Sequence, residues 1–218
     1  MTVVVGVKHR TGVLLAADAQ WSWANDNRLA DITQPKVHEL LETLAIGYCG
    51  SGRFGQILQY HLMDSLEEPY LPREDRDSQY WAVREFIPFL RDVTHQHGHL
   101  HVLEADQTES FGESAFLLAV RGDLFLVESD FSVNMHRLPY EAVGSGAENA
   151  MGVMHNALGD DPKQELVSAK DAEDIAVRAV EAAKTFNNFV GGDISAVETV
   201  LYTEDEKATA KRILANQR

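Results

Sequence analysis

Thr2 is the first residue of the sequence whose type and position could support covalent chemistry. It follows Met1 and opens an apolar run. Once Met1 is removed, the threonine hydroxyl can act as a nucleophile, and the α-amino group of the same residue, with a pKa of about 8, can act as its base. Threonine also follows methionine in many ordinary proteins, as the plain first residue of a strand. The position alone leaves both interpretations open.

Four further positions place polar residues or glycine at the ends of predicted elements. Asp18 ends the second apolar run, Lys36 begins the third strand, Gly50 ends the fourth, and Ser145 lies between two glycines before a helix. Taken singly, each fits a structural role as a strand end, a solvated edge charge or a turn. Their combination with Thr2 makes a catalytic interpretation worth pursuing.

The elements that must position these residues follow from hydrophobic periodicity. Two β-rich runs, 2–8 and 12–18, predict a hairpin, and after a polar loop come two more strands, 36–40 and 44–48. A helix is predicted over 53–66 and a second over 78–96, where Pro88 predicts a kink or a break because proline lacks a backbone N–H.

The second half repeats this order of strands followed by paired helices. The predicted elements are strands 116–120, 124–127, 133–138 and 141–144, helices 146–158 and 169–184, strand 194–202 and a charged C-terminal helix. Strand runs that alternate with helix pairs favour antiparallel sheets with helices on their outer faces. No repeat or linker is evident, so a single domain over 1–218 is expected.

Composition limits the classes of partner. The chain has 218 residues, 44% of them hydrophobic, and a formal net charge of −15. Scattered basic residues and this charge argue against nucleic acid and anionic membrane as partners. A single cysteine, Cys49, and the lack of a signal peptide or of about 18 uninterrupted apolar residues favour a cytoplasmic protein.

Five segments together resemble a known family. They are TVVVGV from Thr2, GVLLAAD ending at Asp18, Lys36-Val37, GYCGSG from Gly47, and VGSGAENAMGV from Val143. This pattern resembles the β-subunits of proteasomes and their bacterial relatives over nearly the whole chain. Asp18 follows Thr2 by sixteen residues as in that family, whereas Lys36 is displaced by two. The resemblance implies an α+β fold, a four-layer αββα sandwich of the N-terminal-nucleophile (Ntn) hydrolase type with two antiparallel sheets.

The resemblance also implies roles for the five polar and glycine positions. Thr2 would attack the peptide carbonyl, beside a positive Lys36 that Asp18 keeps charged and oriented. The N–H of Gly50 would stabilise the oxyanion, and Ser145 would hydrogen-bond near the α-amino group. The implied substrate-contacting residues are Trp21, Ser22, Tyr48 and Gly52. This chemistry uses no cofactor and no metal.

Two positions depart from the family pattern. Where the family often has an aspartate and a serine around the amine, alignment on Gly191-Gly192 gives Asn187 and Val190. An amide can still form a hydrogen bond but carries no negative charge, and a valine side chain offers neither a hydrogen bond nor a charge. Three functions stay open: a self-compartmentalised threonine endopeptidase, a catalytically degenerate ring or scaffold subunit, and a small-molecule amidohydrolase.

The resemblance further implies partners. Unfolded polypeptides or peptides would be the substrates, subunits would assemble into homo-oligomeric rings, and an unfolding ATPase would be a further partner. No nucleic acid or membrane partner is expected.

Two other features need an interpretation. His95, His97, His99 and His101 alternate, which would place four imidazoles on one face of a strand as a zinc or nickel site, although a polar loop after the second helix is the favoured interpretation. Cys49 ends an apolar strand, where cysteine is usually buried and inert rather than nucleophilic.

Overall fold

The computed structural model describes residues 2–23, 28–31, 34–62, 66, 77–102 and 108–203. The chain begins with the predicted hairpin: β1 (Val4–His9) pairs antiparallel with β2 (Gly12–Asp18), from Val4 opposite Ala17 to His9 opposite Gly12. Gly12 is required there because a Cβ atom would overlap the carbonyl oxygen of Thr199.

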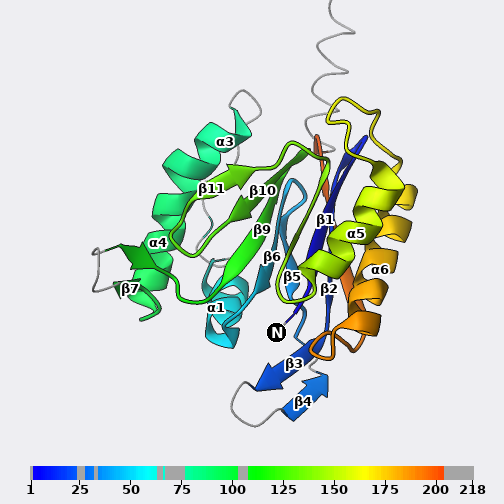
Figure 1. Ribbon diagram of the computed structural model, residues 1–218. Coiled ribbons are helices and arrows are strands. Elements are labelled where there is room, and N and C mark those ends of the chain that lie inside the picture. The colour runs from blue at the N-terminus through cyan, green and yellow to red at the C-terminus, as the bar shows by residue number, and fades with distance from the viewer. Residues whose placement is uncertain are drawn as a thin grey trace, which may run out of the picture.

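The first sheet has four strands in the order β12-β1-β2-β13, with β12 at Tyr140–Val143 and β13 at Ile194–Val200. All of its pairings are antiparallel. Every residue of β2 is buried, which explains its unbroken apolar sequence. The helices α5 (Ala147–Leu158) and α6 (Ala169–Phe186) cover the outer face of this sheet (Figure 1).

The second sheet has five strands, also antiparallel, in the order β11-β10-β9-β6-β5. The strands are β5 (Val37–Leu41), β6 (Leu44–Cys49), β9 (Ala115–Val120), β10 (Asp123–Val127) and β11 (Val133–Met135). Its outer face is covered by the helices α1 (Gly52–Ile57), η1 (Leu58–Leu62), α3 (Ser78–Trp81), η2 (Ala82–Phe86) and α4 (Ile87–Gln96). These helices lie on the opposite side of the sandwich from α5 and α6 (Figure 1).

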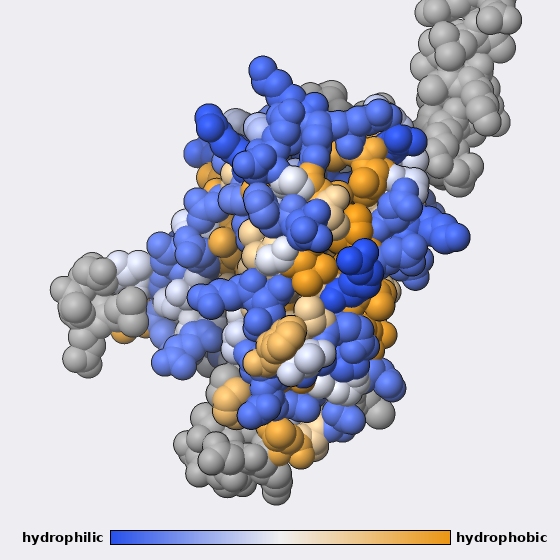
Figure 2. All heavy atoms as spheres, turned by 45° about the vertical axis from the view of Figure 1, so that its right-hand side comes forward, coloured by the Kyte–Doolittle hydropathy of each residue, from blue (hydrophilic) through white to orange (hydrophobic). Residues whose placement is uncertain are grey.

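Three apolar clusters hold the layers together. One lies between the second sheet and its helices, and one lies between the first sheet and α5 and α6. The third joins the two sheets and includes Val4, Leu15, Leu117 and Leu124. The fold is therefore the predicted α+β sandwich of four layers. The face turned forward in Figure 2 is mostly hydrophilic, with apolar patches between the polar side chains.

The prediction of a polar loop before Lys36 is wrong in part. Residues there form a small hairpin of β3 (Gln20–Trp23) and β4 (Arg28–Asp31), in which Trp21 lies opposite Ala30 and Ser22 opposite Leu29. Polar and aromatic residues alternate in β3, and aromatic residues favour strands, so the pattern was present but short.

The helix over residues 78–96 does not break at Pro88. α3, η2 and α4 follow one another without a gap, and η2, directly before α4, is π-helical. Pro88 occupies the first turn of α4, where its missing N–H is best tolerated. The irregularity that proline imposes is thus a wider turn before it rather than a break.

Other predicted boundaries shift or cannot be compared. The helix predicted over 53–66 is α1 followed by the π-helical η1, and the strand predicted over 133–138 is β11, which is shorter. Met1 and the predicted C-terminal helix beyond residue 203 lie outside the described residues. Within the described ranges, every helix is too short or too polar to span a bilayer.

Candidate active site

Thr2 lies directly before β1 and is only 2% exposed. The turn between β12 and α5 holds its backbone, because the Thr2 carbonyl accepts hydrogen bonds from the Gly146 N–H at 3.2 Å and from the Ser145 hydroxyl at 3.4 Å. Gly144 has φ of +96°, and a Cβ atom there would overlap the Thr2 carbonyl oxygen. A glycine at position 144 is therefore required for this close approach.

The Thr2 hydroxyl contacts both charged residues of the predicted site. It donates to Asp18 Oδ1 at 2.9 Å, and Lys36 Nζ lies in contact with Thr2 Oγ1. Lys36 Nζ also donates to Asp18 Oδ1 at 2.9 Å. The three side chains form a closed triangle around the hydroxyl, which brings together the end of β2, the residue directly before β5 and the chain before β1.

Asp18 is fully buried, and backbone N–H groups fix its carboxylate. Oδ1 accepts from Val3 at 3.0 Å, while Oδ2 accepts from Gln20 at 3.2 Å and from Gly191 at 3.1 Å. A buried carboxylate with this many donors has its desolvation offset and cannot rotate freely. Asp18 therefore serves as a fixed anchor for Thr2 and Lys36.

Lys36 is 3% exposed, and this burial lowers its pKa, while the neighbouring Asp18 carboxylate opposes the shift. Its ammonium group also donates to the Gln20 carbonyl at 2.6 Å. A buried lysine with a lowered pKa can hold a positive charge beside a hydroxyl and can also exchange a proton with it. Both properties help to activate an alcohol nucleophile.

Gly50 follows β6 in a backbone conformation that favours glycine. Its φ is +105°, and a Cβ atom would overlap the Glu113 carbonyl oxygen. The next residue, Ser51, donates its N–H to the Ser114 hydroxyl at 2.9 Å and caps α1 by accepting from the Phe54 N–H. These contacts fix the turn that carries the Gly50 N–H.

Asn187 and Val190 lie on the other side of Thr2. Asn187 directly follows α6, and its Nδ2 donates to the Ser145 carbonyl at 2.6 Å, while its Oδ1 accepts from Phe189 at 3.0 Å. Val190 is 3% exposed and packs in the apolar cluster below α5 and α6. Asn187 thus reaches Thr2 indirectly, through the Ser145 turn, and Val190 contributes packing.

The residues predicted to contact substrate lie in two places. The ring of Trp21 covers Gly52 so closely that a Cβ atom at Gly52 would overlap it, and Ser22 is its neighbour in β3. Tyr48 is instead buried in the core at 2% exposure, with its hydroxyl against Gly55. Trp21 and Gly52 are brought together, whereas the Tyr48 ring lies in the core against Gly55. Burial raises the pKa of Tyr48 to about 12.

Cys49 is half-buried, and burial raises the pKa of its thiol, although Lys36 nearby opposes this shift. A protonated thiol is a poor nucleophile, so the structure assigns Cys49 no activated state. The histidines of the 95–101 run are also placed: His95 lies in α4, His97 follows it, and His101 begins β7 (His101–Val102), which pairs with β8 (Glu109–Ser110). In the part of the chain that the structure describes, no three His, Cys, Asp or Glu side chains lie close enough to hold a metal ion.

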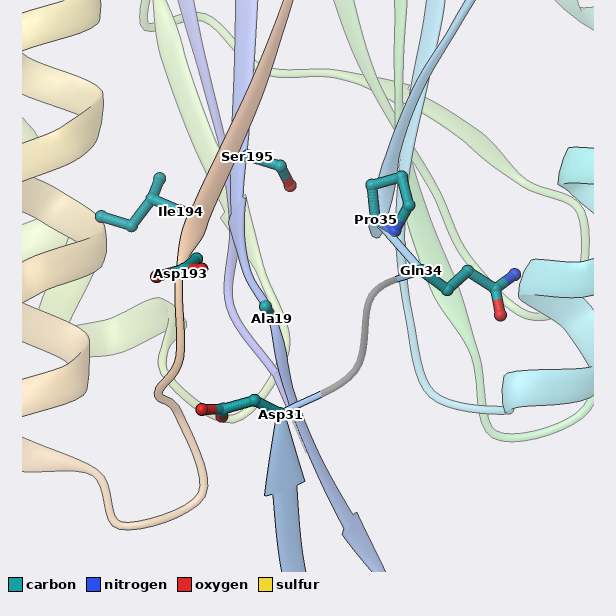
Figure 3. Close-up of a pocket in the computed structure, with 7 residues that line it drawn as sticks. All are labelled: Ala19, Asp31, Gln34, Pro35, Asp193, Ile194 and Ser195. Atoms are coloured by element: carbon teal, nitrogen blue, oxygen red, sulfur yellow. The ribbon is translucent and has the colours of Figure 1, made fainter.

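A cavity of about 360 Å³ lies beside the Asp18 and Lys36 segments. Figure 3 shows that it opens between the start of β13 and the chain that leads into β5, and that Ala19 and Pro35, next to Asp18 and Lys36 in sequence, form its walls. The remaining lining residues are Asp31, Gln34, Asp193, Ile194 and Ser195.

Sequence reasoning missed two contributors to the site. Gln20 supplies a carbonyl to Lys36 and an N–H to Asp18, and Gly191 supplies a second N–H to Asp18. The Gly191-Gly192 pair was a visible turn signal. For Gln20 no signal was available, because its contribution comes from the backbone.

Comparisons with known proteins agree with this fold. No family model matches the chain. A proteasome subunit beta 1 from Thermococcus gammatolerans is 27% identical over 200 residues, which cover 90% of this chain and 88% of that protein. The chain is thus similar to proteasome β-subunits over most of its length.

Solved structures show the same fold. The proteasome-like chain is similar to Thiobacillus denitrificans BPH, with a TM-score of 0.67, 22% identity and coverage of 93% of this chain and all of that one. The same protein in complex with epoxomicin gives a TM-score of 0.65. A eukaryotic HslV from Trypanosoma brucei gives a TM-score of 0.60 at 16% identity, over 91% of this chain and 99% of that one.

Proposed function

We propose that the chain is a threonine peptidase subunit that cleaves peptide bonds with Thr2 as nucleophile, after Met1 is removed. The contact of the Thr2 hydroxyl with both Asp18 and Lys36 carries this proposal, because a buried ion pair around one hydroxyl has no evident structural need. The similarity of the chain to a proteasome β-subunit supports it.

In the proposed reaction the freed α-amino group of Thr2 takes the hydroxyl proton, and Oγ1 attacks the carbonyl carbon of the substrate. The Gly50 N–H stabilises the oxyanion, while Lys36 stabilises charge on Oγ1. The C–N bond breaks as the leaving amine takes the proton, which leaves an ester on Thr2. Water then attacks the ester carbon with the same amine as base, the C–O bond to Thr2 Oγ1 breaks as Oγ1 takes the proton back, and the new carboxylate leaves.

Assembly and substrate are part of the same proposal. A proteasome subunit and HslV among the related proteins support homo-oligomeric rings that enclose the sites, with unfolded polypeptides as substrates and an unfolding ATPase as partner. A cytoplasmic location stays an expectation. Electron microscopy of the purified protein tests the rings, and a low-order oligomer with an open pocket would instead support the amidohydrolase.

The decisive experiment joins intact mass with turnover. Mass spectrometry is expected to show a mature chain that begins at Thr2 and that hydrolyses fluorogenic peptides. Thr2→Ala is expected to abolish hydrolysis and also labelling by an epoxyketone such as epoxomicin, which is bound in the Thiobacillus structure. Unchanged hydrolysis in Thr2→Ala sinks the proposal.

A second candidate, a catalytically degenerate ring or scaffold subunit, is favoured by one observation. Asn187 uses its amide on the Ser145 carbonyl and Phe189, and Val190 is packed in the core, so these two positions place no carboxylate or hydroxyl beside the Thr2 amine. Retained Met1 together with no epoxyketone labelling supports this candidate.

A further inference from the structure

A second cavity, of about 730 Å³, lies apart from the one in Figure 3. Its walls come from the start of α1, from the β7–β8 hairpin and from the turn before β9, and the residues that matter below are Ser51, Arg53, His99, His101, Ser110 and Glu113. This volume is within the range of pockets that bind small molecules.

Two opposite charges line this cavity without neutralising each other. Arg53 and Glu113 are both exposed, and within the described ranges neither has an ion-pair partner. Arg53 donates to the His97 carbonyl at 3.4 Å, which is a long and weak hydrogen bond. A guanidinium and a carboxylate on one cavity can therefore bind the two ends of a ligand that carries both charges.

The cavity also has a buried imidazole. His99 is 8% exposed and stacks on Phe54 with ring centroids 5.8 Å apart. Among the described residues its Nε2 has no hydrogen-bond partner. Burial, and then the neighbouring His101, lower the pKa of His99, which favours the neutral ring. His99 therefore contributes a neutral aromatic wall to the cavity, which Ser110 also lines.

The walls of this cavity belong to the segments that hold the Gly50 turn. Ser51 follows Gly50 directly, and the carbonyl of Glu113 packs against Gly50 so tightly that a side chain there would not fit. The hydroxyl of Ser114, next to Glu113, accepts from the Ser51 N–H at 2.9 Å. A ligand in the cavity therefore touches both segments that fix the oxyanion-binding N–H.

We propose that this cavity binds a short peptide by its free termini, with the carboxylate at Arg53 and the ammonium group at Glu113. The site stands on the cavity and its charges alone. The identification of the ligand as a product that feeds back on the Gly50 turn rests on the proposed function.

Calorimetry with the full-length Thr2→Ala chain tests the site without turnover. The probe is tetra-alanine with free termini, compared with the N-acetylated peptide, the C-amidated peptide and the doubly capped peptide. Each capped terminus is expected to weaken binding about tenfold, because it removes one charge-assisted contact. No saturable binding of the free peptide, or equal affinity for all four, overturns the proposal.

Two variants locate the ends of the peptide. Arg53→Gln should remove the difference between free and amidated C-termini, and Glu113→Gln should remove the difference between free and acetylated N-termini. The matched controls are Arg10→Gln and Glu165→Gln, which alter an exposed ion pair elsewhere, and they should leave all four affinities unchanged. If the two cavity variants weaken binding of the doubly capped peptide as much as binding of the free peptide, the assignment is contradicted.

An independent readout is the NMR signal of the His99 ring, which should shift on addition of tetra-alanine to the Thr2→Ala chain and should need about tenfold more peptide for the same shift in the Arg53→Gln variant. A chain that fails to hydrolyse peptides yet binds tetra-alanine with this charge pattern refutes the proposed function alone. A chain that hydrolyses peptides but lacks the pattern refutes the cavity site alone.

Discussion

The two sides of Thr2 differ in charge and in how firmly their contacts hold the residue. On the hydroxyl side, Asp18 and Lys36 are buried and joined to each other and to Thr2 by short contacts. On the opposite side, Ser145 reaches the Thr2 carbonyl at 3.4 Å, and Asn187 supports Ser145 with a neutral amide. The hydroxyl side is charged and firmly held, whereas the other side is neutral and held by a longer hydrogen bond.

The hydroxyl side places the nucleophile, whereas the Ser145 side is the one that would support its amine. The anchor on the hydroxyl side depends on three backbone N–H groups that fix Asp18, and these come from three separate segments of the chain. The Ser145 side depends on one amide at the end of α6. We therefore expect changes on the first side to affect both stability and activity, and changes on the second to have smaller effects.

Asp18→Asn should have the largest effect. An amide group would place N–H donors against Lys36 or against the backbone N–H groups that now donate to the carboxylate. Removing one partner of a buried pair destabilises a protein by about 3–5 kcal/mol. Urea unfolding should show this loss, and peptide hydrolysis should fall with it. An Asp18→Asn chain as stable as the wild type would show that the anchor is not required for the fold.

Lys36→Met should reduce hydrolysis by about 10²–10⁴-fold, the range typical of a lost proton-transfer or charge-stabilising group. Its effect on stability should be smaller than that of Asp18→Asn, because Asp18 keeps three backbone donors. Lys8→Met is a matched control, since Lys8 pairs with Asp123 at the partly exposed end of β1. Equal loss of hydrolysis in both lysine variants would contradict the role of Lys36.

Much of this hydroxyl side could be predicted from the sequence. Asp18 and Lys36 are side-chain donors and acceptors at the ends of strongly apolar strands, and hydrophobic patterning defines such strand ends well. The same patterning predicted antiparallel sheets with helices on their outer faces, whereas the four-layer order came from the resemblance to proteasome β-subunits. The β3–β4 hairpin was missed because four-residue strands with polar positions give little periodic signal.

The remainder of the site depends on tertiary contacts that leave no pattern. Gln20 acts through its carbonyl and N–H, so its residue type carries no information about its role. Tyr48 was predicted to contact substrate, and its buried position against Gly55 depends on how α1 packs on β6. The charges of Arg53 and Glu113 meet at one cavity although they are far apart in sequence.

Asn187→Ala tests the weaker side. It removes the amide donor of the Ser145 carbonyl at 2.6 Å, and the loss of such a hydrogen bond typically costs about 0.5–1.5 kcal/mol. Hydrolysis should fall by less than in Lys36→Met, because the Thr2 hydroxyl keeps its two charged contacts. Asn188→Ala, one position further along, is the control. If Asn187→Ala destabilises the chain as much as Asp18→Asn, the two sides are equivalent and the comparison fails.

The pH dependence of stability gives the smallest and most specific test. Burial lowers the pKa of Lys36 in the folded chain, whereas in the unfolded chain it is about 10.4. Between these two values the unfolded chain binds more protons, so the Lys36 contribution to the free energy of unfolding should rise with pH and become constant above about 10.4. Urea unfolding from neutral to alkaline pH, as the difference between wild type and Lys36→Met, measures this contribution. Lys8→Met is the control, because it shows how the loss of a lysine elsewhere changes the pH dependence of the free energy of unfolding. A difference that falls with pH would mean that Asp18 raises the pKa of Lys36 more than burial lowers it. Lys36 would then stay charged beside the Thr2 hydroxyl and would not exchange a proton with it.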